Sequence, residues 1–277
     1  MIQTDGLSKT PSDIQIERRE PSIDIEACLT RDWHGGDPFK TAWFNAFSIT
    51  FPTGERFFID AVRAFEEQIE DASLKAHMRA FSGQEAQHRR EHQTYNEVLC
   101  AARGYDLARM EARQTTRIEW IKNSASRYQW LAATVALEHI TAIMADGILR
   151  NPAWLDGAEP EMAQLWRWHA IEETEHKSVA FDVYRAANGW DGTRRQILKI
   201  VTYHLLRDTL SHTRHMLGVA GLGNDPKVWW NGLAFLFGPR GIWRPLLPQW
   251  NAFRRADFHP WDHDNRDQLN TWAPQLL

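Results

Sequence analysis

Three residues in the stretch His169-Ala-Ile-Glu-Glu-Thr-Glu-His176 are of types that bind metal ions and could share one side of a helix. No Gly or Pro occurs between Met162 and Ala187, so the sequence predicts one continuous helix there. At about 100° per residue, His169 and His176 fall roughly 40° and 60° from Glu173. A carboxylate and an imidazole one turn apart can converge on one ion. The alternative interpretation is a charged, solvated helix face.

A second copy of this spacing favours the metal interpretation. Glu85-Ala-Gln-His88 repeats Glu-x-x-His in another helical pattern, and His92 follows on the same face. Two further acids lie in apolar helical surroundings. The resulting order, Glu, Glu-x-x-His, Glu, Glu-x-x-His, is the ligand set of ferritin-like di-iron and di-manganese bundles. The sequence therefore predicts a dinuclear metal site whose ligands are Glu55, Glu85, His88, Glu138, Glu173 and His176, with His169 and His92 as additional candidates.

The positions of the predicted turns agree with this site. Residues at one level of an antiparallel helix pair are equidistant from the turn that connects them. The midpoint between Glu55 and Glu85 lies at Glu70-Asp71-Ala72-Ser73, which offers N-cap residues for a new helix. The midpoint between Glu138 and Glu173 lies inside residues 151–160, a segment that contains two Pro, one Gly and one Asn and so breaks a helix.

The composition excludes several classes of protein. The chain has 277 residues, 43% of them hydrophobic, and a net charge of −4. An acidic chain of this kind does not suit nucleic-acid binding. Its two cysteines cannot build a disulfide framework or a Cys-based zinc site. The polar N-terminus lacks the apolar core of a secretory signal, and no apolar run is long enough to span a membrane. These features predict a cytoplasmic protein.

The fold class expected is all-α: a ferritin-like four-helix bundle with a long crossover, an extra helix and a Trp-rich C-terminal segment. Residues 1–30 are expected to be a mobile arm, residues 31–218 the bundle with its metal site, and residues 219–277 a segment that packs on the bundle. Within the bundle, Pro52 is expected to open the first helix after a lead-in segment, and Ser124 or Ser126 to cap the third. The crossover, residues 104–123, is expected to be partly helical.

The segment 226–261 permits two interpretations. Tryptophans and short apolar runs alternate with Arg240, Arg244, Arg254 and Arg255. The first interpretation is a lid that packs against the bundle. The second is an interfacial segment, because Trp and Arg beside short apolar runs suit the surface of a membrane.

Five motifs together resemble a bacterial family described as predicted metal-dependent hydrolases. The resemblance extends over most of the chain, from about residue 31 to residue 264. It implies metal-dependent hydrolysis as the activity. The motifs are Phe51-Pro-x-Gly-Glu-Arg-Phe-Phe58, Gln84-Glu-Ala-Gln-His88 with His92, Leu137-Glu-His139, Trp168-His-x-x-Glu-Glu-x-Glu-His176 and Phe258-His-Pro-Trp-Asp262.

The ligand set is also similar to that of the di-iron arylamine N-oxygenases, which have an additional histidine one turn before the last Glu-x-x-His. His169 occupies that place here. The rest of the sequence is not similar to that of those enzymes, so their substrate cannot be inferred for this chain.

These observations lead to three functional hypotheses. The first is an O₂-activating di-iron oxidase or oxygenase that acts on a small apolar or aromatic substrate, because four carboxylates neutralise two divalent ions and oxygen and nitrogen donors suit iron. The second is a metal-dependent hydrolase, in which manganese or zinc could also serve. The third is a non-catalytic metal-binding or membrane-associated protein. Expected partners are a small-molecule substrate, a second copy of the chain as a homodimer, and a membrane surface contacted through residues 226–261.

Overall fold

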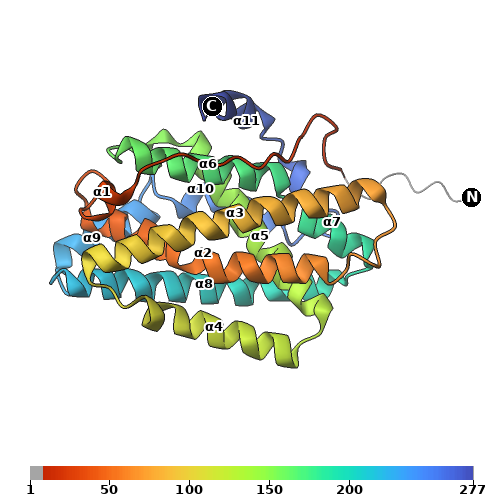
Figure 1. Ribbon diagram of the computed structural model, residues 1–277, viewed down its shortest axis with the longest axis horizontal. Helices are drawn as coiled ribbons and strands as arrows, with labels where there is room; N and C mark the ends of the chain where they lie inside the picture. Colours follow the sequence, from red (N-terminus) through yellow and green to blue (C-terminus); the bar gives the residue numbers. More distant parts are fainter. Residues whose placement is uncertain (1–8, 277) are drawn as a thin grey trace, which may run out of the picture.

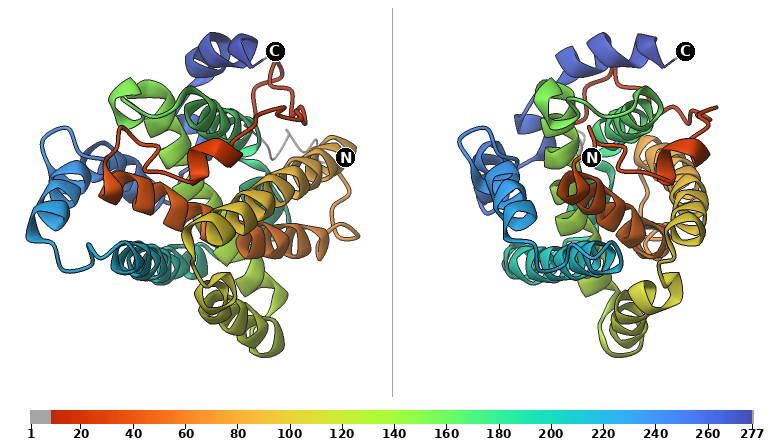
Figure 2. Two further views of the ribbon diagram at one scale, coloured as in Figure 1. Left: turned by 60° about the vertical axis from the view of Figure 1, so that its left-hand side comes forward. Right: turned by 90° about the vertical axis from the view of Figure 1, so that its left-hand side faces the viewer.

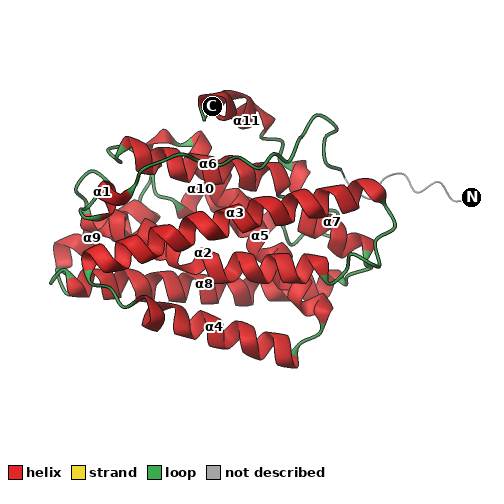
Figure 3. Cartoon of the chain, in the orientation of Figure 1, coloured by secondary structure: helices red, strands yellow, loops and turns green. Residues whose placement is uncertain are grey.

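The computed structural model describes residues 9–276 and shows an all-helical protein (Figure 1, Figure 3). Among these residues the β-structure is one isolated bridge between His34 and Ala158. The α-helices are α1 (Glu26–Leu29), α2 (Pro38–Arg63), α3 (Ala72–Arg103), α4 (Leu107–Ser124), α5 (Arg127–Arg150), α6 (Pro160–His176), α7 (Val179–Ala186), α8 (Asp191–Val219), α9 (Pro226–Phe237), α10 (Trp243–Ala252) and α11 (Arg266–Trp272).

Helix α2 begins fourteen residues earlier than the sequence predicts, and Pro52 lies inside it. The Asp37 side chain accepts hydrogen bonds from two backbone N–H groups of the first turn, and so caps the helix at this earlier position. Pro52 has no N–H to offer the Ser48 carbonyl. The Asn96 side chain donates to that carbonyl instead, at 3.0 Å. A tertiary contact therefore replaces the helical bond that Pro52 removes.

The predicted helix from 162 to 187 is interrupted, and this prediction is wrong. Helix α6 ends at His176 and α7 begins at Val179. At the break, the Lys177 ammonium donates to the His263 carbonyl and to Asn265. It also lies 3.7 Å from the centre of the Trp261 ring. These contacts with the distant C-terminal segment keep Lys177 buried. The sequence around Lys177 does not predict them, because the partners are more than 80 residues away.

Other helix boundaries follow their sequence signals. Asp71 caps α3, and Gly104 ends it with a left-handed φ of 70°. Ser126 caps α5 through a capping box with Gln129. The crossover predicted to be partly helical forms the continuous helix α4.

Four helices position the candidate ligands, and their directions can be read from two apolar clusters at opposite ends of the protein. Helices α2 and α6 run from the cluster that contains Phe44 and Trp166 toward the cluster that contains Phe58 and Phe81. Helices α3 and α5 run the other way. Because α3 and α5 are parallel, the chain must return along the whole length between them, and α4 makes this return (Figure 1, Figure 2).

Residues 9–25 lie against α6 and α7, although composition suggested a mobile arm for residues 1–30. The Arg19 guanidinium binds both oxygens of Glu175, at 3.0 and 2.7 Å, and its backbone N–H donates to Glu172. Residues 1–8 lie outside the described residues. The contacts of Arg19 depend on acids far away in the chain, which composition does not reveal.

Among the described residues, one helix has the length and composition of a membrane span, namely α5. Within the 18-residue apolar stretch of α5, 83% is buried inside the protein. Helix α5 is therefore a core helix, and its apolar character comes from packing against α6 and α8.

The C-terminal segment is fastened to α5 through Asp146. Its carboxylate accepts hydrogen bonds from Arg150, His263, Gln249 and Asn265, at 2.8 to 3.2 Å. Burial acts to raise the pKa of Asp146, but the hydrogen bond and charge of His263 and the charge of Arg150 outweigh it and lower the pKa to about 2. The negative charge of this carboxylate therefore stabilises the fold.

The variant Asp146→Asn should unfold with a free energy about 2 kcal/mol lower at neutral pH, because Arg150 and His263 lose a buried anionic partner. The lowered pKa gives a contribution that is present above the unfolded value, near 4. That contribution is lost as the pH falls from about 4 to about 2. Urea unfolding of both proteins at pH 7 and pH 2 checks this, and an equal deficit at the two pH values would contradict it.

Candidate metal centre

Four buried carboxylates from four helices face one another in the middle of the protein. Glu55, Glu85, Glu138 and Glu173 come from α2, α3, α5 and α6, and none is more than 4% exposed. Both oxygens of the first three carboxylates, and one oxygen of Glu173, accept no hydrogen bond within the protein. A buried carboxylate oxygen that accepts no hydrogen bond destabilises the folded protein unless a cation binds to it. The donor set therefore fits bound metal ions.

Ligand-type atoms in this cluster are close enough to share ions. Several groups of three have their nitrogen and oxygen atoms within 4.8 Å of one another. They are Glu55, Glu85 and His88; Glu85, Glu173 and His176; His88, His169 and Glu173; and Glu55, His92 and His169. Glu138 joins them through an oxygen 3.4 Å from Nε2 of His176. The structure thus brings together all eight residues that the sequence singled out.

His176 is oriented from outside the cluster by Gln84. The Gln84 amide nitrogen donates to Glu175 and to the Glu17 carbonyl, so its oxygen must be the atom that lies 2.8 Å from Nδ1 of His176. Nδ1 therefore carries the proton and donates it to Gln84. In neutral His176, the bare Nε2 faces Glu85, Glu138 and Glu173 at 3.2 to 3.6 Å. This is the orientation of a metal-binding histidine with a hydrogen-bonded outer nitrogen.

His88 is held in the same way by Glu172. Its Nε2 lies 3.0 Å from Glu172, which can only accept, so Nε2 donates and Nδ1 is left to face Glu173 at 3.4 Å. Trp168 and the Arg19 backbone N–H also donate to Glu172 and fix its position. A carboxylate behind a histidine in this arrangement raises the basicity of the nitrogen that faces the ion.

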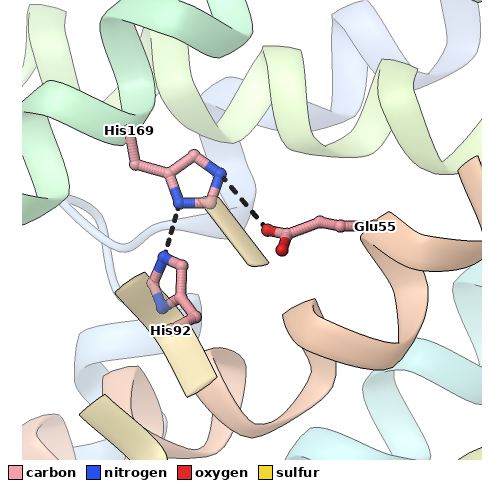
Figure 4. Close-up of side chains that lie close together, drawn as sticks. All are labelled: Glu55, His92 and His169. Carbon is pink, nitrogen blue, oxygen red and sulfur yellow. Dashed lines mark hydrogen bonds and ion pairs between the residues drawn. The ribbon is translucent and has the colours of Figure 1, made fainter. Parts of the chain in front are cut away.

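His169 ends a chain of hydrogen bonds that begins at Asn96. Figure 4 shows the last contacts of this chain, between His92 and His169 and between His169 and Glu55. Asn96 donates to the Ser48 carbonyl, so its oxygen accepts from the Ser48 hydroxyl. Ser48 can then only accept from Nδ1 of His92, at 2.9 Å. Neutral His92 must in turn accept, through Nε2, the Nδ1 proton of His169 at 2.7 Å. His169 is left with a bare Nε2, and this atom lies 3.0 Å from Glu173 and 4.0 Å from Glu55.

The lowered pKa values of His92 and His169 agree with this distribution of protons, whereas the raised values of His88 and His176 favour a second proton on each of these two in the metal-free protein. Burial and then the charge of Glu85 raise the pKa of Glu55 and Glu138 well above their usual range. Burial lowers the pKa of His92, and burial and then the charge of His88 lower that of His169 to about 4, so both are neutral. For His176, the effect of burial is outweighed by Glu173 and the pKa is raised. Protons thus balance the carboxylates in the metal-free protein, and metal ions would replace them.

The residues that orient the histidines have no signal in the sequence. Helical phase places Glu172 outside the arc of His169, Glu173 and His176, and it lies instead behind His88. Gln84 precedes Glu85 in a motif quoted above, but its partner His176 is 92 positions away in the chain. The periodicity of one helix cannot reveal such partners, because they depend on how α3 packs against α6.

Other ligand-type residues lie outside this cluster. His259, in the motif from Phe258 to Asp262, pairs with Asp182 and so holds the C-terminal segment on α7. His263, just after the motif, pairs with Asp146 of α5. His212 is buried on α8.

The variant His169→Ala should lose metal affinity by about tenfold or more, because it removes a bare nitrogen that faces two carboxylates. His92→Ala should lower the metal affinity less. His92 only accepts a hydrogen bond from Nδ1 of His169, on the side away from the carboxylates, so its loss removes no nitrogen that faces the ions. Metal titration of both variants measures the difference. Full metal content in His169→Ala would exclude His169 as a ligand and would remove the likeness to the N-oxygenases.

Comparison with known proteins agrees with the metal interpretation. Searches of curated proteins and of solved structures found no match. A family model described as predicted metal-dependent hydrolase matches residues 17–264, a range that contains the eight clustered residues and the outer residues Gln84 and Glu172. The chain therefore belongs to the family of predicted metal-dependent hydrolases.

Proposed function

We propose that the protein is a metal-dependent hydrolase with a dinuclear centre made by Glu55, Glu85, His88, Glu138, Glu173, His176 and His169. The observation that carries the proposal is the buried set of carboxylate oxygens without donors, faced by histidine nitrogens whose outer sides are already bonded. Family membership supports the reaction type. Two bound divalent ions would supply Lewis acidity, which polarises an ester or phosphate bond and lowers the pKa of a coordinated water.

The protein's own residues would hold and position these ions. Gln84, Glu172 and His92 fix the orientation of the three histidines, and the chain from His169 through His92 to Ser48 can hold a proton away from the ions. The parallel α3 and α5 with α4 between them support a ferritin-like bundle with one long crossover as the fold that carries the centre.

A cavity of about 960 Å³ beside α2, α4, α5 and α8 is the proposed substrate pocket. It reaches Gly54 and Leu137, the chain neighbours of Glu55 and Glu138. Its walls are largely apolar, with Arg113 and Arg117 among the lining residues. Both arginines pair with Asp208, which also lines the cavity. The apolar walls support a small substrate with an apolar or aromatic body.

O₂ activation by a di-iron centre is the second candidate function. The observation that favours it is the donor set: four carboxylates and three imidazoles, all less than 5% exposed, suit iron and can neutralise two divalent ions. None of these seven side chains lines any of the described cavities, and a gas molecule needs less access than an ester.

Metal-loaded protein separates the two functions. Zinc- and manganese-loaded protein should cleave aryl esters or aryl phosphates, and Glu138→Gln should lose this activity while Glu97→Gln, an exposed control on α3, keeps it. If ferrous protein consumes O₂ and changes its visible absorption while no metal form cleaves these substrates, the hydrolase proposal is wrong and the oxidase takes its place.

A further inference from the structure

Helix α9 has apolar side chains on both of its faces. Its inner face packs closely on α2, since a Cβ added at Gly232 would lie 2.3 Å from the Phe39 ring. On its outer face, Trp230, Leu233 and Phe237 follow one another at helical spacing. They are 73%, 47% and 64% exposed. A helix that only covered the bundle would not need this second apolar stripe.

An apolar cavity of about 450 Å³ opens beside this stripe. Leu210, Leu233, Phe237 and Leu247 line the cavity and are also exposed, so they form its mouth. Several polar groups in the wall are paired within the protein. The Trp250 indole donates to the hydroxyl of Thr202, which donates to the Leu198 carbonyl, and the Trp229 indole donates to the Gly223 carbonyl. The cavity therefore offers contacts to a hydrocarbon chain, at a volume suited to a small ligand.

The charge of this region is opposite to that of the whole protein. Residues 209–256 contain six Lys or Arg residues and one acid, Asp225, while the chain has a net charge of −4. Asp225 caps α9 by accepting from two backbone N–H groups of its first turn. Arg240, between α9 and α10, and Arg244, in the first turn of α10, are both exposed. Exposed aromatic and aliphatic side chains flanked by arginines match the chemistry of an anionic lipid surface.

We propose that the face formed by α9 and α10 docks on an anionic lipid bilayer, with Trp230 and Phe237 inserted among the lipids and one acyl chain entering the cavity. Arg240 and Arg244 bind the headgroups. This inference is independent of the proposed function, because the cavity is on another side of α5 from the carboxylates. Ile140 and Ile143 line it, and both are roughly 140–160° from Glu138 around the helix.

Vesicle co-sedimentation of the full chain tests the proposal. The wild type should bind vesicles of phosphatidylcholine mixed with phosphatidylglycerol, and bind pure phosphatidylcholine at least about tenfold more weakly. The double variant Trp230→Ser with Phe237→Ser should reduce binding to the anionic vesicles at least about tenfold. Trp120→Ser is its control, since Trp120 is 66% exposed on α4.

A charge-reversal pair separates headgroup binding from the apolar contact. Arg240→Glu with Arg244→Glu should also reduce binding about tenfold or more, and raised salt should weaken the wild type in the same direction. Arg89→Glu with Arg90→Glu, exposed on α3, is the control. Circular dichroism confirms that each variant is folded, and the charge pair remains informative if the apolar pair does not fold.

Three results would overturn the proposal. The first is that neither vesicle composition binds the wild type. The second is that monomeric dodecanoate binds in the cavity while vesicles do not, which would make the ligand a free fatty acid. The third is a dimer in sedimentation velocity that Trp230→Ser with Phe237→Ser dissociates without any vesicle binding, which would make the face an interface between two copies.

Discussion

The variant Glu138→Gln should bind metal at least about a hundredfold more weakly than the wild type, yet be the more stable of the two when both are metal-free. Glu138 is buried among other carboxylates, and burial and the charge of Glu85 raise its pKa well above its usual range. A glutamine amide is neutral without taking up a proton, and it can donate hydrogen bonds to the neighbouring carboxylates. We expect a gain of roughly 1–3 kcal/mol in the metal-free free energy of unfolding.

Chemical denaturation of the wild type and of Glu138→Gln, each with and without metal, measures this. The difference in free energy of unfolding between the two proteins should change sign when metal is added. Glu97→Gln, exposed on α3, should leave both curves unchanged. A metal-free Glu138→Gln protein that is clearly less stable than metal-free wild type would show that Glu138 supports the fold directly, and the centre would then be a structural polar network.

Removal of metal should make stability strongly dependent on pH. Glu55, Glu85, Glu138, His88 and His176 all have raised pKa values, so in the folded metal-free protein they hold protons that the unfolded chain has released. The stability that these groups contribute is present below the unfolded values, near 4.3 for Glu and 6.5 for His. It is lost as the pH rises through the raised folded values.

Glu173 acts in the opposite direction. Burial would raise the pKa of Glu173, but the charge of His176 outweighs burial and lowers this pKa. The stability that Glu173 contributes is therefore present above about pH 4 and is lost as the pH falls. Between pH 5 and pH 8 the raised groups therefore dominate, and metal-free protein becomes less stable as the pH rises. In metal-loaded protein, cations replace these protons and the slope should be much smaller.

Thermal unfolding of chelator-treated and metal-reconstituted protein from pH 5 to pH 8 checks this. The difference in Tm between the two forms should widen by about 5 °C or more toward pH 8, which corresponds to roughly 2 kcal/mol. Parallel curves across this range would contradict the account, because they would mean that the buried carboxylates and histidines do not exchange protons for metal.

The candidate ligands could be predicted from the sequence because helical spacing and turn position are local properties. The Glu-x-x-His spacing determines which side chains share one face of a helix. The turns near residue 70 and residue 155 determine which residues lie at the same height on the two helices that each turn connects. The N-caps Asp71 and Ser126 are equally local, since each accepts from its own first turn.

The remaining features depend on contacts between distant parts of the chain. Pro52 is tolerated inside α2 because the Asn96 side chain donates a hydrogen bond to the Ser48 carbonyl, which would otherwise lack a donor. The break after His176 occurs where Lys177 donates a hydrogen bond to Asn265. Gln84 and Glu172 orient histidines on other helices. None of these partners has a periodic or compositional signal, so the structure is needed to find them.

Anomalous diffraction from crystals of protein purified without added metal tests the dinuclear centre most directly. We expect two peaks about 3.5–4 Å apart. They should lie between the carboxylates of Glu55, Glu85, Glu138 and Glu173, with His88, His169 and His176 contributing nitrogen. A map with no peak there, or with its peak beside Cys28 and Glu159, which form a separate group of ligand-type residues, would contradict it.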